Sequence, residues 1–106
     1  MTSDSDYWQD LFSEFGSVTV KRMFGGEGIF FDGLMIALVD DGTLYLKADP
    51  LSAARFTQRG LAQFCYVKRG KAVKMSYYLA PEETLDDPQQ MKEWAVLAYQ
   101  AALRAR

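Results

Sequence analysis

The chain has 106 residues, 49% of them hydrophobic and 25% charged, which is the composition of an ordinary globular domain and excludes a disordered or collagen-like chain. Its length predicts a single domain over residues 1–106. The net charge of −2 is unevenly placed, because residues 17–79 hold +4 whereas residues 1–16 hold −4 and residues 80–106 hold −2. A basic middle indicates either a surface for an anionic partner or solvated strand ends balanced by acidic helices.

Large apolar residues near the start of the chain follow the spacing of one helix face. Acidic residues lie outside this stripe, which predicts an amphipathic helix that packs on a sheet. We expect Ser3 and Asp6 to cap its start and Gly16 to end it in a left-handed conformation. The stripe consists of Tyr7, Trp8, Leu11, Phe12 and Phe15.

Four strands connected by short turns are predicted next. Gly25 and Gly26 allow the chain to reverse tightly, and Asp32 with Gly33 is a pair that favours a type I′ hairpin. A second such pair, Asp41-Gly42, gives another hairpin signal. The third strand is apolar on both faces, so we place it centrally in an antiparallel meander. The predicted strands cover residues 18–23, 28–31, 34–39 and 43–47.

A second helix should begin after the meander. Asp49 is placed to cap it, Pro50 occupies its first position, and Gly60 should end it just after Arg59. Arg55 and Arg59 lie one turn apart on a shared face, which suits a clamp for phosphate or carboxylate. The alternative is a pair of solvated surface cations.

Two further strands, over residues 64–69 and 71–78, flank Gly70 and form a hairpin with a basic tip. Its cations suit contacts to nucleic-acid phosphates, and nearby tyrosines suit stacking on bases. The alternative is that lysine keeps a strand edge from aggregating. The candidate nucleic-acid-binding residues are Arg55, Arg59, Lys68, Arg69, Lys71 and Lys74, and the candidate stacking residues are Tyr66, Tyr77 and Tyr78.

The chain closes with one helical turn over residues 82–85 and a long helix that Asp87 caps and Pro88 starts. Its buried stripe is Met91, Trp94, Ala95, Ala98 and Ala102, and apolar surface off the stripe, which suits contact with a second copy, comes from Leu97, Tyr99 and Leu103. The fold class is therefore α+β, with two layers, an antiparallel sheet of about six strands and helices packed against it in the order α-β4-α-β2-α.

The sequence holds no histidine, which excludes Ser-His and Cys-His nucleophile pairs and the commonest metal ligand. We expect no cofactor, no metal and no catalytic residue, and we interpret Cys65, inside a predicted strand, as a buried inert thiol. The single cysteine, the acidic start of the chain and the shortness of every apolar run predict a cytoplasmic protein without membrane contact. A small-molecule enzyme of unknown reaction is the third hypothesis for function.

Two strings of residues resemble a known family. They are Val20-Lys21-Arg22-Met23-Phe24-Gly25-Gly26 and Met75-Ser76-Tyr77-Tyr78, and the hairpins between them match in order. The chain from about Tyr7 to Leu103 resembles the N-terminal domain of the TfoX (Sxy) family of bacterial competence regulators. That resemblance implies a two-layer α+β domain. It also implies a role in activating DNA-uptake genes with the cyclic-AMP receptor protein, in members that carry a second, C-terminal domain.

We therefore expect a regulatory protein-interaction domain without catalysis, whose partner is a transcription factor and which also forms a homodimer. Direct nucleic-acid binding through the basic hairpin is the second hypothesis. The residues that match the family strings are equally explained as builders of the sheet. The candidate partner-binding residues are Arg22, Met23, Phe24, Gly25, Gly26, Tyr77 and Tyr78.

Overall fold

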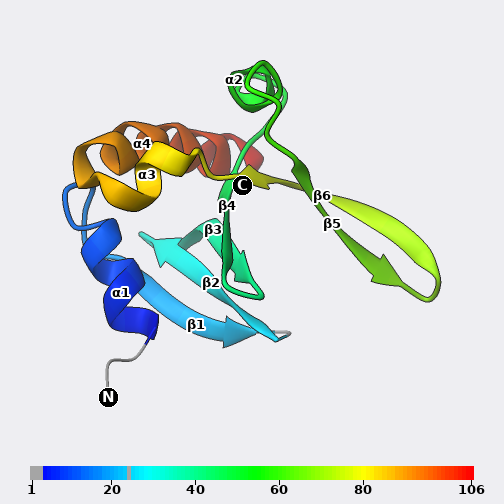
Figure 1. Cartoon of the computed structure of the whole chain (residues 1–106), viewed down its shortest axis with the longest axis horizontal. Coiled ribbons are helices and arrows are strands. Elements are labelled where there is room, and N and C mark those ends of the chain that lie inside the picture. The colour runs from blue at the N-terminus through cyan, green and yellow to red at the C-terminus, as the bar shows by residue number, and fades with distance from the viewer. Residues whose placement is uncertain (1–3, 24) are drawn as a thin grey trace.

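The computed structural model describes residues 4–23 and 25–106 and shows one antiparallel sheet with helices against it (Figure 1). The strands lie in the order β1-β2-β3-β4-β6-β5. The strands are β1 (Thr19–Met23), β2 (Gly26–Phe31), β3 (Leu34–Asp40), β4 (Thr43–Lys47), β5 (Gln63–Lys68) and β6 (Lys71–Leu79). The helices are α1 (Asp4–Leu11), α2 (Ala53–Thr57), α3 (Glu82–Asp86) and α4 (Pro88–Ala105). The α+β prediction is confirmed, including the six strands, whereas the predicted cap at Ser3 lies outside the described residues.

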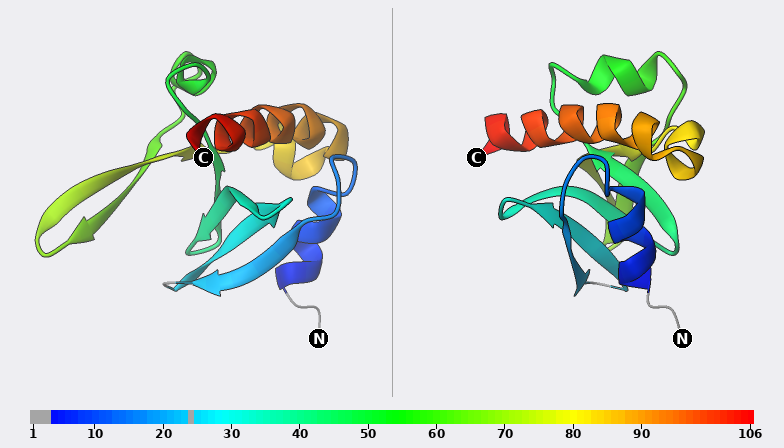
Figure 2. Two further views of the ribbon diagram at one scale, coloured as in Figure 1. Left: turned by 180° about the vertical axis from the view of Figure 1, so that it is seen from behind. Right: turned by 90° about the vertical axis from the view of Figure 1, so that its left-hand side faces the viewer.

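The core lies between the sheet and two of the helices. Helix α4 packs on β3 and β4, and α1 packs beside it on β1 (Figures 1 and 2). The central strand β3 is buried over Ile36–Val39, as its apolar character on both faces predicts. The predicted stripe of α4 is buried as well. Side chains that reach zero or nearly zero exposure at this interface include Phe12, Ile29, Ile36, Leu46 and Met91.

Two apolar residues of α4 outside its buried stripe, which the sequence predicts to be available for contact with a second copy, pack within the molecule. Leu97 and Tyr99 pack against the core. The Tyr99 ring lies 4.9 Å from the Phe31 ring, and its hydroxyl donates a 2.9 Å hydrogen bond to Asp32 Oδ2. This bond raises the pKa of Tyr99 above its ordinary value. The hydroxyl therefore ties α4 to the turn between β2 and β3.

Two-residue turns set the hairpins. Asp32 and Gly33 have φ of 53° and 77°, and Asp41 and Gly42 have φ of 50° and 78°, which are the left-handed conformations of type I′ turns. The prediction from the Asp-Gly pairs is confirmed. Between β5 and β6 the turn has the same signs, with Arg69 in the first position.

The expectation for Gly16 is wrong in its mechanism. Helix α1 ends at Leu11, and Gly16 does not adopt a positive φ. A Cβ at this position would lie 2.7 Å from Cε1 of Phe31. Glycine is needed here because the chain passes close to an aromatic ring. The helix ends five residues earlier and is followed by a hydrogen-bonded turn.

Helix α2 is shorter than predicted, since it begins at Ala53 and not at Pro50. Reciprocal bonds close a turn first: Asp49 Oδ1 accepts from the amides of Leu51 and Ser52, both at 3.1 Å, and the Asp49 amide donates to Ser52 Oγ at 3.0 Å. Asp49 therefore caps a turn that leads into the helix. Gly60, with φ of 71°, follows the helix as the expected stop.

Two ion pairs hold the helices together. Arg59 forms a two-pronged pair with Glu83, at 2.6 and 2.8 Å, and Arg104 pairs with Asp49. The hydrogen bonds from Arg59 and Arg104 lower the pKa of Glu83 and of Asp49, each to about 2. The first pair joins the turn after α2 to α3, and the second joins the end of α4 to the turn before α2.

Acid should weaken these links. Each carboxyl titrates at a lower pH when folded than when unfolded, so the unfolded chain takes up more protons and stability falls as the pH drops from about 4 to about 2. Arg59→Met and Arg104→Met should therefore each reduce the loss of stability between about pH 7 and about pH 3. Urea unfolding at the two pH values measures the loss of unfolding free energy in each variant and in the wild type. An unchanged pH sensitivity in both variants would contradict the assignment.

None of the helices in the described part of the chain combines the length and the apolarity needed to cross a bilayer.

Candidate protein-binding groove

The β5–β6 hairpin extends beyond the rest of the sheet (Figures 1 and 2). Strand β4 pairs with β6 only from Tyr77 to Leu79. The preceding part of the hairpin, residues 64–76, has no strand of the meander beside it, and we call it the arm. Apart from the Ala48 amide, which donates a 2.8 Å hydrogen bond to the Ser76 carbonyl, the backbone pairing described there joins the two strands of the arm to each other.

A break in the strand register marks the base of the arm. Gln63 pairs with Tyr78, but Cys65 already pairs with Lys74, so β6 contains two more residues than β5 across this step. Such irregularities bend and twist a ribbon. The Gln63 side chain donates a 2.9 Å hydrogen bond to the Met75 carbonyl, which satisfies an acceptor at the irregular step. The bend turns the arm out of line with β1–β4.

The angle between the arm and strands β2 and β3 forms an apolar groove of about 470 Å³. It lies on the face of the sheet opposite α4. Ile36, Ala37 and Val39 of β3 belong to the core that packs on the helices, whereas the groove residues Met35 and Leu38 do not. Asp40 and Lys68 also line it. Its large apolar residues, which define the groove below, are Met23, Met35, Leu38, Phe64, Tyr66 and Met75.

Local packing shapes the floor and the base of the groove. A Cβ at Gly28 would lie 2.6 Å from Met23 Sδ and 3.0 Å from Met35 Sδ. The absence of a side chain on Gly28 therefore leaves room for both thioethers beside its backbone. The Phe64 ring lies 4.9 Å from the Tyr45 ring and holds the base of the arm against β4. The surface that results is mainly hydrocarbon and sulfur. Such a surface suits apolar side chains of a ligand, and methionine adapts to their shape.

The structure brings together only part of the predicted partner-binding set. Met23 and Gly26 line the groove, and Gly25 forms the adjoining turn with φ of 81°. Tyr77 lies beside it: its hydroxyl donates to the Met35 carbonyl at 3.5 Å. Burial raises the pKa of Tyr77 to about 12, so its phenol stays protonated and polar.

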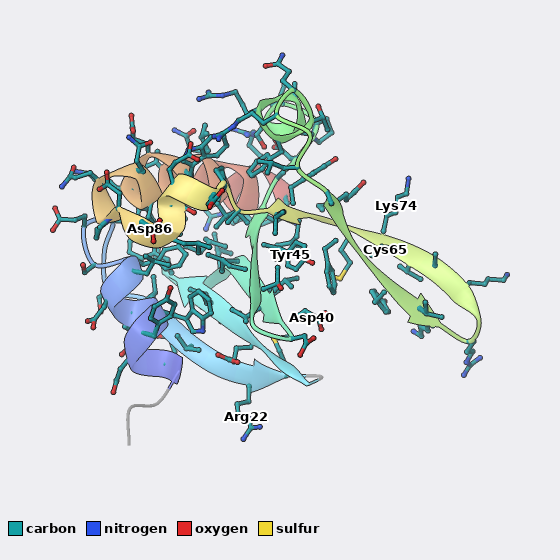
Figure 3. All side chains as sticks on the ribbon, viewed as in Figure 1. Arg22, Asp40, Tyr45, Cys65, Lys74 and Asp86 are labelled. Atoms are coloured by element: carbon teal, nitrogen blue, oxygen red, sulfur yellow. The ribbon has the colours of Figure 1, made fainter. Side chains whose placement is uncertain are left out.

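Two members of the set lie elsewhere. Arg22 is exposed on β1 and points away from the molecule (Figure 3). Tyr78 faces the helices, where its ring stacks on Phe56 at 5.3 Å. Phe24 lies outside the described residues. Neighbours in a strand point to opposite faces, so Tyr77 and Tyr78 do not share one surface.

The predicted nucleic-acid-binding residues fall into two groups. Arg55 and Arg59 lie over the Trp94 ring, each 5.7 Å from its centre, and Arg59 is committed to Glu83. The four cations of the hairpin are exposed on the arm, whose tip lies away from α2 (Figure 1). They are Lys68, Arg69, Lys71 and Lys74. The six residues therefore do not form one continuous basic surface.

The prediction of a buried thiol at Cys65 is wrong, because its side chain is exposed (Figure 3). The residue does lie in a strand, as predicted, but β5 is the last strand of the sheet. It belongs to the arm, whose pairing partner is β6 alone among the described residues. Burial depends on what covers a strand, and here little does.

Four groove residues were missing from the predicted surface: Met35, Leu38, Phe64 and Met75. One signal for them was present, because residues 34–39 are apolar on both faces although the predicted helices cover only one. A central position in the sheet also explains this pattern. That explanation is correct for the strand order but does not identify the groove.

Comparisons with known proteins point to one family. The profile of the TfoX N-terminal domain matches residues 10–102. The chain is 35% identical to the DNA transformation protein TfoX1 of Aliivibrio fischeri over 63 residues, which are 59% of this chain and 30% of that protein. It is 26% identical to Protein Sxy of Escherichia coli K12 over 98 residues, which are 92% of this chain and 47% of that protein.

The chain thus spans less than half the length of either relative. The profile match, in contrast, covers nearly all of the described structure, from the end of α1 to the last turns of α4. The resemblance seen in the two sequence strings is confirmed. The chain belongs to the TfoX N-terminal domain family.

Proposed function

We propose that this domain is a non-enzymatic regulatory module that binds a transcription factor through the groove. Its family supports a regulatory role, since one relative is named a DNA transformation protein. The single observation that carries the choice of site is the groove itself: three methionines, a leucine and two aromatic rings line an open concavity on the helix-free face of the sheet.

The groove suits a segment of protein. It is partly open to solvent, and Tyr66 on its arm side is 38% exposed, so the site offers an apolar surface for a chain to lie on. Charges of opposite sign, Asp40 and Lys68, stand among the lining residues. We therefore expect the partner segment to present a row of apolar side chains with a cation to meet Asp40 and an anion to meet Lys68.

Met75→Glu should weaken partner binding by at least about tenfold, since it places a carboxylate where the partner would remove water. The matched control is Ser76→Glu. Ser76 is the next residue of β6, is exposed and faces the other side of the sheet, so the same charge is added outside the groove. Titration calorimetry with the cyclic-AMP receptor protein, the co-regulator that the family resemblance implies, measures the affinities.

Equal affinities of the two variants would overturn the choice of the groove. If the wild-type domain bound neither this factor nor any other transcription factor tested, the proposed function would be overturned. Circular dichroism of both variants checks that the sheet is retained. We expect the sheet to survive the Met75 substitution, because this side chain is only partly buried.

A further inference from the structure

The two edges of the sheet differ in how they are protected. At one end, β1 carries Lys21 and Arg22 in its middle, and adjacent charges of this kind discourage another strand from pairing. At the other end, β5 has the sequence Gln-Phe-Cys-Tyr-Val-Lys, whose single charge lies at its last residue. Val67 on this strand is 73% exposed. An uncharged, extended edge is a template for strand pairing.

The turn at the tip shows which backbone groups of β5 are free. Arg69 and Gly70 form a two-residue turn of type I′, so Lys68 and Lys71 form a pair that exchanges backbone hydrogen bonds. Such pairs alternate with pairs that do not. Tyr66 therefore bonds inward to β6, whereas the backbone groups of Cys65 and Val67 point out of the sheet edge.

We propose that β5 pairs with β5 of a second copy of this chain, antiparallel and around a two-fold axis at Tyr66. Cys65 of one copy then lies opposite Val67 of the other, and the two exchange the backbone hydrogen bonds that each edge leaves open. The two Tyr66 side chains face each other in the central pair. Both ends of the contact repeat the same pairing, as a two-fold interface requires.

Charge favours an identical antiparallel strand as the occupant. In this register the two basic tips lie at opposite ends of the interface, so their cations do not meet. Lys68 of one copy comes opposite Phe64 of the other on the groove face, where an ammonium over an aromatic ring is favourable. The uncharged middle of β5 pairs with itself. A parallel arrangement would instead bring the two tips together.

The dimer would change the groove as well as the mass. A two-fold axis through the sheet keeps the groove faces of both copies on one side, and Phe64 and Tyr66 of each copy then adjoin those of the other. Two grooves become one longer apolar surface. This inference goes beyond the proposed function and does not depend on it, because it rests on the edge of β5 alone.

Light scattering of the full chain tests the inference. The wild-type protein and Val67→Ala should have about twice the 12.0 kDa mass of one chain, and Val67→Pro should have the mass of one. Proline removes an amide that points out of the edge and leaves the bonds to β6 in place. Circular dichroism should show the same fold in all three. A monomeric wild type, or a Val67→Pro protein that stays dimeric, would overturn the proposal.

Cross-linking tests the register. Val67→Cys places a thiol opposite Cys65 of the second copy, so oxidation should convert most of the protein into a covalent dimer. Two controls should cross-link far less, since their thiols lie diagonally apart: the wild type, and Val67→Cys combined with Cys65→Ser. Equal cross-linking in all three would contradict a two-fold axis at Tyr66.

Discussion

Gly26→Ala should lower the free energy of unfolding by about 3–5 kcal/mol, among the largest effects of any single change in the chain. A Cβ on Gly26 would lie 1.9 Å from the Val39 carbonyl oxygen. That oxygen belongs to the backbone of β3, which pairs with β2 next to this point, so the two strands would have to separate. Urea unfolding followed by circular dichroism measures the loss.

Gly25→Ala is the matched control. Nothing lies within 4 Å of the position that its Cβ would take, but Gly25 has φ of 81°. The only cost is the left-handed conformation of an alanine, about 1–2 kcal/mol. Equal losses in the two variants would show that the strand pairing at Gly26 is looser than described. The two glycines of the family string are thus needed for different reasons: Gly25 for its left-handed conformation, and Gly26 for the close approach of β3.

Phe56→Ala should cost about 3–5 kcal/mol, because a fully buried aromatic ring leaves a cavity. The ring stacks on Tyr78 at 5.3 Å and meets Trp94 at 5.1 Å, so it joins α2 to both β6 and α4. Its loss should detach α2 from the sheet. The free energy of unfolding and hydrogen exchange of the α2 amides measure the two effects.

Phe56→Leu keeps an apolar group in the same place and should cost only about 1–1.5 kcal/mol. If the alanine variant were no less stable than the leucine variant, the Phe56 contact would not be what holds α2. The comparison separates loss of volume from loss of hydrophobicity at one position.

Features that depend on neighbouring residues could be predicted from the sequence. The Asp-Gly pairs gave the type I′ turns because their φ values are a local property. The apolar stripe of α4 and the cap at Asp87, whose Oδ1 accepts from the Gln89 amide at 2.9 Å, follow from helical spacing and from residue type. The apolar character of residues 34–39 on both faces predicts a strand inside the sheet, and β3 lies between β2 and β4.

The groove could not be predicted in the same way. It depends on β6 joining β4 rather than β1, and on the register break between Gln63 and Cys65, which are both pairings between distant segments. The alternation within each strand was visible, but not the angle at which two parts of the sheet would face each other. Met75 and Met35, 40 positions apart in the sequence, share a surface only because of that angle.

The errors have a related cause. Cys65 was expected to be buried because its strand contains apolar residues, yet nothing among the described elements covers that side of the arm. Arg59 was expected on a surface shared with the hairpin, but Glu83, 24 residues later, holds it beside α3. In both cases the neighbour that decides the outcome comes from another part of the chain.

The most direct measurement of partner binding at the groove is the NMR spectrum of methyl-labelled methionine. Met23, Met35 and Met75 line the groove, whereas Met91 belongs to α4 and is fully buried in the core. On addition of the transcription factor, the first three methyl signals should shift or broaden together, and the Met91 signal should stay in place. If the factor binds and leaves the three groove signals unchanged, the partner uses another surface.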